Sequence, residues 1–111
     1  MICDFFHQDQ LYQENLLTKY YLKKGHEVTI LASTTESIFD YYNGVYNKSN
    51  KPNTYYYNNF KVIRLKYSLN LLNKVRCLKG LRNAINEENP DIIYVHGFML
   101  NLFEAIRYKS S

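Results

Sequence analysis

The stretch Glu27-Val-Thr-Ile-Leu-Ala-Ser33 decides the fold, because it is a nearly continuous apolar run rich in β-branched residues. A second run of this kind, Asp91-Ile-Ile-Tyr-Val-His96, lies toward the other end of the chain. Continuous apolarity, in contrast to alternation, is typical of strands covered on both faces, as in a parallel sheet between helices. Both runs are short enough to be single strands. We therefore predict two buried strands of a parallel sheet.

A helix is expected directly before the first of these strands. Residues 10–24 contain neither Pro nor Gly and end in two lysines followed by Gly25, a combination typical of a helix end. Ahead of this helix, the stub Ile2-Cys-Asp-Phe-Phe6 is typical of the end of a strand, with too few residues for a complete central strand. Residues 2–33 are thus predicted to form a β-α-β unit whose first strand is truncated.

A second unit is predicted after residue 60. The run 61–66 alternates in part, with Ile63 and Leu65 on one face, which favours a half-exposed strand near a sheet edge. Residues 69–88 carry apolar side chains at spacings of three and four, which predicts a helix that ends before Pro90. The stripe consists of Leu71, Val75, Leu78, Leu81 and Ile85. With a further helix expected over 99–108, the alternation of strands and helices predicts an α/β domain with a parallel sheet.

A Tyr- and Asn-rich stretch over residues 39–60 separates the two units. We interpret it as a long insertion that holds a short helix near 37–42 and a short strand near Tyr55. Loops of this length inside compact domains are commonly functional or disordered. Codon bias in an AT-rich genome also explains most of these tyrosines and asparagines, so both interpretations stay open.

Length and composition limit the class of protein. A chain of 111 residues with 46% hydrophobic and 22% charged residues is typical of one globular domain. No apolar run approaches the ~18 residues of a membrane span, and no signal-peptide pattern follows Met1, which argues against an integral membrane or secreted protein. The two cysteines, Cys3 and Cys77, are too few for a disulfide framework, and we expect reduced core thiols in a cytosolic chain.

Candidate ligand-binding residues follow the predicted strands, because open parallel sheets bind ligands beyond the carboxyl ends of their strands. His96 ends one strand, and Gly97 lets the backbone approach a ligand closely. His7 lies in the loop after the first strand, and Glu14 lies in the first turn of the following helix. Each has an ordinary alternative: His96 can be a core imidazole, Glu14 can complement the helix dipole, and His7 can be solvated.

Most of the net charge of +4 comes from one acid-free block between residues 61 and 82. This block contains Lys61, Arg64, Lys66, Lys74, Arg76, Lys79 and Arg82. It is either a solvated face or a contact for an anionic membrane surface, where each base near the surface contributes roughly 1 kcal/mol. Lys74 and Arg82 fall within the apolar arc of the predicted helix, so they extend past it, line a pocket, or indicate that the helix is interrupted near Gly80.

Several kinds of site are disfavoured by missing motifs. No GxGxxG follows the first strand and no GxxxxGK[ST] occurs, which disfavours a dinucleotide fold and a P-loop. No GxSxG nucleophile motif is present. His, Cys and carboxylates do not stand at metal-ligand spacing, so we expect no metal and no cofactor. Nucleic acid is not an expected partner either, since no reader motif accompanies the positive charge.

Four stretches resemble the N-terminal domain of retaining GT-B glycosyltransferases of the family-four type, which build bacterial capsule, O-antigen and other surface polysaccharides. They are Asp4-Phe-Phe-His-Gln-Asp-Gln10, Gln13-Glu-Asn-Leu-Leu17, Lys24-Gly-His-Glu-Val-Thr-Ile30 and Pro90-Asp-Ile-Ile-Tyr-Val-His-Gly97. The resemblance spans essentially the whole chain. The order and spacing of the four stretches make it more specific than any one of them.

The resemblance implies a Rossmann-like sheet flanked by helices, forming the acceptor-binding half of a GT-B enzyme. Such an enzyme transfers a sugar with retention from a nucleotide-sugar, through an ion pair in which the donor phosphate takes the acceptor proton. His96 would lie beside the transferred sugar, and Glu14, His7 and Gly97 would line the cleft. The family's nucleotide-sugar domain is not part of these 111 residues, so the chain alone is not expected to transfer sugar.

The implied partners are the nucleotide-sugar, a glycan or lipid-linked acceptor, and the inner membrane surface, which Lys74, Arg76, Lys79 and Arg82 would contact. The implied location is the cytoplasm, with peripheral attachment to the membrane. Where the family carries glycines before the first helix, this chain has Gln10, Leu11 and Tyr12, whose β-carbons restrict backbone approach to a phosphate. The alternative is a truncated, non-catalytic remnant that acts only as a binding module.

Overall fold

The protein is a mixed α/β structure built on a small sheet. A computed structural model describes residues 1–6, 13–34, 52–71, 75–96 and 101–110. β1 (Thr29–Ser33) pairs in parallel with β3 (Phe60–Leu65), and β2 (Asn53–Tyr57) pairs antiparallel with the other edge of β3, giving the order β1-β3-β2. Ile2 adds parallel bridges to Leu31 of β1 on one side and to Val95 on the other.

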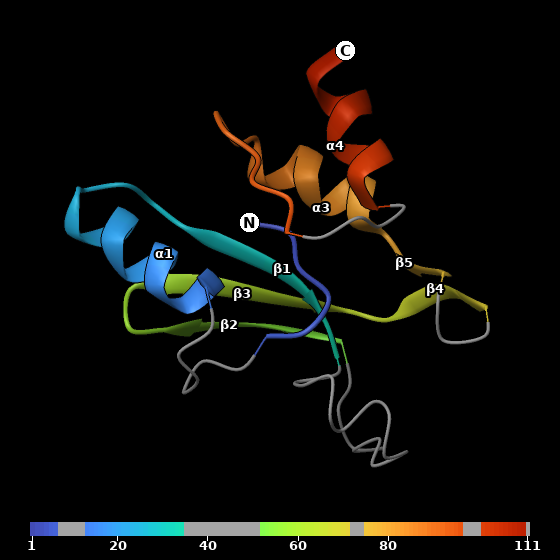
Figure 1. Ribbon diagram of the computed structural model, residues 1–111, viewed down its shortest axis with the longest axis horizontal. Helices are drawn as coiled ribbons and strands as arrows, with labels where there is room; N and C mark the ends of the chain where they lie inside the picture. The colour runs from blue at the N-terminus through green and yellow to red at the C-terminus, as the bar shows by residue number, and fades with distance from the viewer. Residues whose placement is uncertain (7–12, 35–51, 72–74, 97–100, 111) are drawn as a thin grey trace.

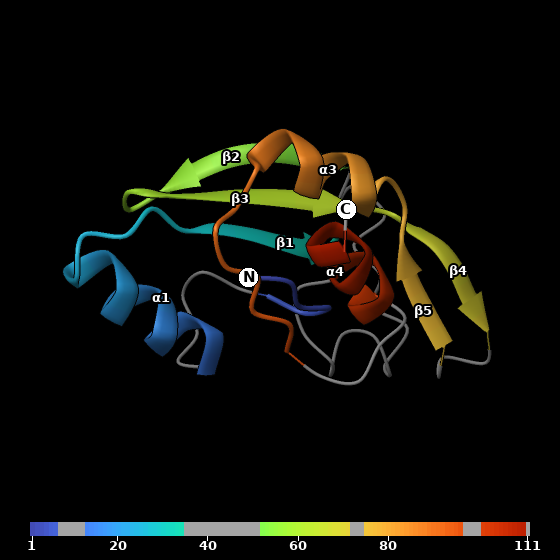
Figure 2. The ribbon, with the colours of Figure 1, turned by 90° about the horizontal axis from the view of Figure 1, so that it is seen from above.

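Helices and a second hairpin complete the described part of the chain (Figure 1). α1 (Gln13–Lys23) precedes β1. A hairpin of β4 (Tyr67–Leu71) and β5 (Val75–Leu78) follows β3 and leads into α3 (Leu81–Glu88). α4 (Asn101–Ser110) packs beside α3, and Figure 2 shows both helices over the same side of the sheet. No described helix has the length and apolarity to cross a membrane.

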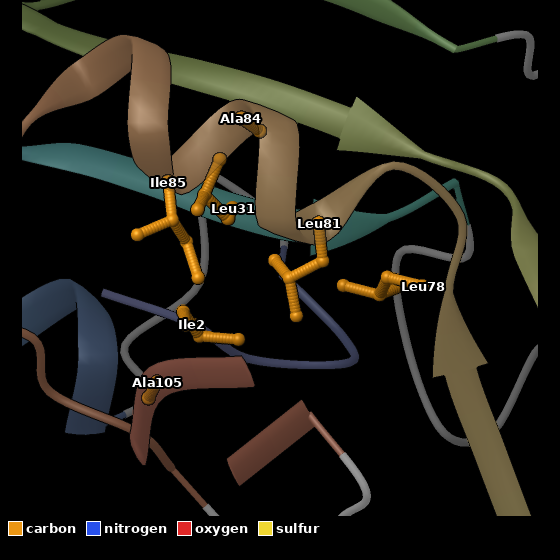
Figure 3. Close-up of a cluster of buried hydrophobic side chains, with 7 residues drawn as sticks. All are labelled: Ile2, Leu31, Leu78, Leu81, Ala84, Ile85 and Ala105. Atoms are coloured by element: carbon orange, nitrogen blue, oxygen red, sulfur yellow. The ribbon is translucent and has the colours of Figure 1, made fainter. Parts of the chain in front are cut away.

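Two hydrophobic clusters lie on opposite faces of the sheet because strand side chains alternate. The first joins the sheet to α3 and α4 through Ile2, Leu31, Leu78, Leu81, Ala84, Ile85 and Ala105 (Figure 3). The second consists of Cys3, Phe6, Ile30, Ala32, Phe60 and Val62, with Leu22 of α1 packed against it. The near-continuous apolarity of residues 27–33 is thus explained, since β1 contributes to both clusters.

The prediction of a helix directly before β1 is confirmed. α1 ends at Lys23, two residues before Gly25, whose φ of 87° is the left-handed conformation that favours glycine after a helix. The backbone N–H of His26 donates to the carbonyl of Tyr21 and closes the helix end. The helix predicted over 99–108 is also confirmed, as α4, whereas the run 91–96 forms only the bridge at Val95.

The strand predicted over 61–66 is confirmed as β3, but its predicted position near a sheet edge is wrong. β3 lies between β1 and β2, and its Val62 and Arg64 are buried. The cause is a two-residue hairpin turn at Asn58 and Asn59, whose φ values of 46° and 74° match the positive values that a type I′ turn requires. This turn folds the strand predicted near Tyr55 back along β3. The helix predicted near 37–42 lies outside the described residues.

The prediction of one helix over 69–88 is wrong in its first half. Residues 67–71 and 75–78 form the antiparallel strands β4 and β5, and the helix begins only at Leu81, after Gly80 with a φ of 76°. Leu69 and Leu71 also alternate with polar neighbours, so the same residues fit the strand period of two. The helix is therefore interrupted near Gly80, and Arg82 in addition lines a pocket, so two of the alternatives hold.

Candidate functional site

The candidate site lies at the carboxyl edge of the parallel strands, where residues from separate parts of the chain meet. His96 directly follows the bridge residue Val95, and its backbone N–H donates to the carbonyl of Ile2 at 2.9 Å. Asp4 follows Ile2, and its carbonyl accepts a hydrogen bond of 2.9 Å from the backbone N–H of Ser33. The ends of three neighbouring chain segments are thereby fixed in one row.

Glu14 reaches this edge from the first turn of α1. Its Oε1 lies 3.1 Å from Nε2 of His96, so two of the residues predicted from the sequence are in direct contact. The Glu14 side chain is only 7% exposed, whereas that of His96 is 42% exposed. The pair therefore connects a buried carboxylate to an imidazole that solvent or a ligand can reach.

The buried face of α1 is polar, which is unusual for a helix in a small domain. Its buried residues are Glu14, Asn15 and Thr18, while Leu16 and Tyr20 are more than half exposed. The Thr18 hydroxyl donates to the backbone carbonyl of Glu14 at 2.7 Å and fixes the first turn. Burying polar groups costs free energy unless they are hydrogen-bonded. A buried polar face of this kind is therefore a candidate for a functional surface.

Asp4 is a second buried carboxylate at this edge, 6% exposed. It accepts a short hydrogen bond from the hydroxyl of Tyr67, the first residue of β4. The Ser33 hydroxyl donates to the Asp4 carbonyl at 2.6 Å. Asp4 thus ties the site to the β4–β5 hairpin.

Arg64 is a buried cation near the same edge, 5% exposed. Its guanidinium donates to the Ser33 carbonyl at 3.1 Å and to the Tyr55 hydroxyl, and it lies over the ring of Phe6. These contacts cross-link the end of β1 to β2. Arg64 belongs to the fold and is not a surface charge.

Cys3 lies among these charged groups without being reactive. Burial and the nearby Glu14 and Asp4 carboxylates raise the pKa of the Cys3 thiol to about 12, against the lowering effect of the N-terminus and Arg64. Such a thiol stays protonated at neutral pH and is a poor nucleophile. Both cysteines are free, and Cys3 is a buried thiol as predicted, whereas Cys77 is only half-buried and does not belong to the core.

Sequence reasoning missed Asp4, Arg64 and Tyr67 as members of this region. The alternation that places Arg64 on the same face as Val62 was a usable indication, because Val62 is a core residue. A usable indication for Asp4 was its position in the strand stub, two residues after Ile2. Nothing in the sequence pattern pointed to Tyr67, since the hairpin that carries it was predicted as a helix.

Other predicted site residues are distributed differently. His7, Gly97 and Lys74 lie outside the described residues, and of Arg76 only the backbone, in β5, is described. Lys79 is exposed, and Arg82 pairs with Glu104 of α4 at 2.9 Å. Outside this edge, a cavity of about 290 Å³ lies between α3 and α4, lined by Arg82, Ile85, Asn86, Glu104, Arg107 and Tyr108.

The basic block is less uniform in space than in sequence. Lys61 pairs with Glu88 at the end of α3, Arg64 is buried, and Arg82 is paired. Within the described ranges, no group of three His, Cys, Asp or Glu side chains is arranged to hold a metal ion. The described site is therefore a set of hydrogen-bonding side chains, with Glu14 and His96 at its centre.

Comparison of the chain with protein-family models, with curated proteins and with solved structures found no significant match.

Proposed function

We propose that this protein is the acceptor-binding half of a retaining glycosyltransferase of the GT-B type, acting in the synthesis of a bacterial surface polysaccharide. The observation that carries the proposal is the 3.1 Å contact between His96 and Glu14 at the carboxyl edge of the parallel strands. The resemblance implies that His96 lies beside the transferred sugar and that Glu14 lines the cleft near the diphosphate and acceptor. Their meeting is what a shared ligand site requires.

The order of the strands supports the proposal. In chain order the parallel segments are those at Ile2, β1, β3 and Val95, and their spatial order is third, second, first, fourth. This is the order of the first four strands of a doubly wound sheet, in which ligands bind where the strand order reverses. The reversal here lies between Ile2 and Val95, and His96 follows it directly.

The side chains at the edge suit a reaction that needs orientation more than covalent catalysis. When the donor phosphate takes the acceptor proton, the protein has to hold sugar hydroxyls in place and supplies no nucleophile. An imidazole and buried carboxylates are hydrogen-bonding groups of the required kind. Orientation alone can account for several orders of magnitude in rate.

The membrane contact expected from the basic block has less support than the sugar site. Within the fold, Lys61 pairs with Glu88 and Arg64 is buried. The exposed basic residues that the structure describes in this block are Lys66, Lys79 and Arg82. Arg82 pairs with Glu104, but its side chain stays 54% exposed. An anionic membrane surface stays a proposed partner through these residues. The nucleotide-sugar and the glycan or lipid-linked acceptor are the proposed substrates.

The proposal is tested by sugar transfer. The protein, expressed from its complete reading frame, is incubated with radiolabelled UDP- and GDP-sugars and with lipid-linked and oligosaccharide acceptor fractions, and the anomeric configuration of the product is read by NMR. We expect label in the acceptor with the donor configuration retained. Inverted configuration would contradict the mechanism, and glycan binding without transfer would support a non-catalytic binding module instead.

A further inference from the structure

The contact between Glu14 and His96 determines which ring nitrogen carries a hydrogen. A carboxylate oxygen accepts hydrogen bonds, and Nε2 of His96 lies 3.1 Å from Oε1 of Glu14, so this contact favours a hydrogen on Nε2. In a neutral imidazole one nitrogen donates and the other accepts. Nδ1 of His96 is then the acceptor, and any ligand group that meets it has to donate.

The exposed fractions of the two side chains show that Glu14 is fixed inside the fold and that His96 is accessible to a ligand. Glu14 is fixed in the first turn of α1, where the helix dipole favours a carboxylate and Thr18 braces its carbonyl. Its side chain is 7% exposed, and its Oε1 lies against Nε2 of His96. The imidazole, 42% exposed, is the part that reaches outward.

We propose that Glu14 is a positioning residue, which holds Nε2–H of His96 and so presents Nδ1 as an acceptor for a hydroxyl group of the sugar. This inference rests on the proposed function, and it assigns the chemistry of the ligand at this position. Glu14 and Asp4 place two buried carboxylates at this edge against one buried cation, Arg64, and this excess of negative charge disfavours a phosphate against His96. The group bound at His96 is a hydroxyl, and phosphates of the donor lie elsewhere.

The test is the tautomer of His96, read from long-range ¹H–¹⁵N spectra of the 111-residue chain labelled with ¹⁵N-histidine. The spectra are recorded at about pH 8.5, and each neutral tautomer gives its own pair of Nδ1 and Nε2 shifts. The wild type is expected to carry its hydrogen on Nε2. Glu14→Gln, which keeps an acceptor oxygen, should preserve this tautomer, and Glu14→Met, which removes it at similar volume, should mix the two forms.

Exposed His26, whose ring contacts Tyr21, is the internal control and should not change in either variant. A wild-type hydrogen on Nδ1, or a Glu14→Met spectrum identical to the wild type, would overturn the positioning role. The wild-type result decides by itself if Glu14→Met does not fold. Inorganic phosphate should leave both His96 nitrogen shifts in place, and a shift of Nδ1 would overturn the assignment of a hydroxyl.

These spectra separate failure of the positioning role from failure of the proposed function, because they need no transfer activity. A fixed Nε2 tautomer in a protein that transfers no sugar would refute the function alone. Retained transfer by a wild type with mixed tautomers would refute the positioning role alone. In the transfer assay, Glu14→Met should lower kcat about tenfold, with Glu14→Gln recovering most of it.

Discussion

Two polar side-chain pairs lie at opposite ends of the same parallel strands, and they are built differently. At the amino edge, Glu88 of α3 accepts from Lys61, in β3, and from the hydroxyl of Thr29, the first residue of β1. At the carboxyl edge, Glu14 meets His96. The first pair combines a carboxylate with two donors that close it off, whereas the second sets a more deeply buried carboxylate against a partly exposed imidazole.

The difference teaches which pair serves the fold and which is available for chemistry. Lys61 and Glu88 join α3 to the sheet, as an interlayer contact in any α/β domain can. Glu14 and His96 join the polar face of α1 to the end of a strand, where a simple apolar contact would be more stabilising. Polar groups kept at such a position are candidates for function.

Removing the core side chain of Ile2, which bridges β1 and the segment that ends at His96, should cause the largest loss of stability. Ile2 is 1% exposed and packs against Leu31 and the α3 cluster, so Ile2→Ala should lower the free energy of unfolding by about 3 kcal/mol. Urea denaturation followed by circular dichroism measures this loss. Ile2→Val is the matched control and should cost about 1 kcal/mol. A loss below that of the control would mean that Ile2 is not a core residue.

Breaking the amino-edge pair should have a moderate effect on stability alone. Glu88→Ala removes the contacts to Lys61 and Thr29 and should cost about 1 kcal/mol in urea denaturation. The neighbouring exposed Glu87→Ala is the control and should be nearly neutral. Equal losses of stability in the two variants would show that the Lys61–Glu88 pair does not stabilise the fold.

The same pair predicts the pH range of this difference. Burial raises the pKa of Glu88, but hydrogen bonds from Lys61 and Thr29 and the charge of Lys61 hold it below its ordinary value of 4.5. A depressed folded-state pKa means that the contribution is present above pH 4.5 and is lost as the pH falls through the folded-state value. The hydrogen bond to Glu88 raises the pKa of Lys61 above 10.5, so its contribution is lost at still higher pH. The difference between wild type and Glu88→Ala should therefore shrink at both extremes.

The exposed pair between α3 and α4 should have the smallest effect. The side chains of Arg82 and Glu104 are 54% and 26% exposed, so Arg82→Ala should change the free energy of unfolding by no more than about 0.5 kcal/mol. Thermal denaturation at low and high salt checks this, and salt should reduce the difference further. A loss as large as that of Glu88→Ala would show that the α3–α4 contact depends on this pair.

The sequence predicted the parts of the fold that local patterns determine. α1, β1 and the candidate edge follow from a glycine stop, continuous apolarity and the rule for parallel sheets. The helix over 69–88 failed because Leu69, Leu71 and Val75 fit both periods, and pairing between β4 and β5 decides between them. Tertiary contacts of this kind are not visible in a local pattern.

The sequence predicted where the candidate site lies, but not which of its side chains are in contact. Both Glu14 and His96 were placed at the carboxyl edge, yet their contact depends on the rotation of α1, whose polar face turns inward. Hydrophobic periodicity points the other way, since it favours burying Leu16 and Tyr20. The buried Arg64 was hidden for the same reason, because its place depends on β2 covering β3.

The transfer rate of His96→Ala, measured beside that of Glu88→Ala, tests the division between the two pairs most directly. His96→Ala should lower the rate of sugar transfer by about 10- to 100-fold while its Tm stays close to that of the wild type. Glu88→Ala should transfer at the wild-type rate below its own Tm. Unchanged turnover in His96→Ala, or an equal loss in both variants, would contradict a functional carboxyl edge and return His96 to the structural residues.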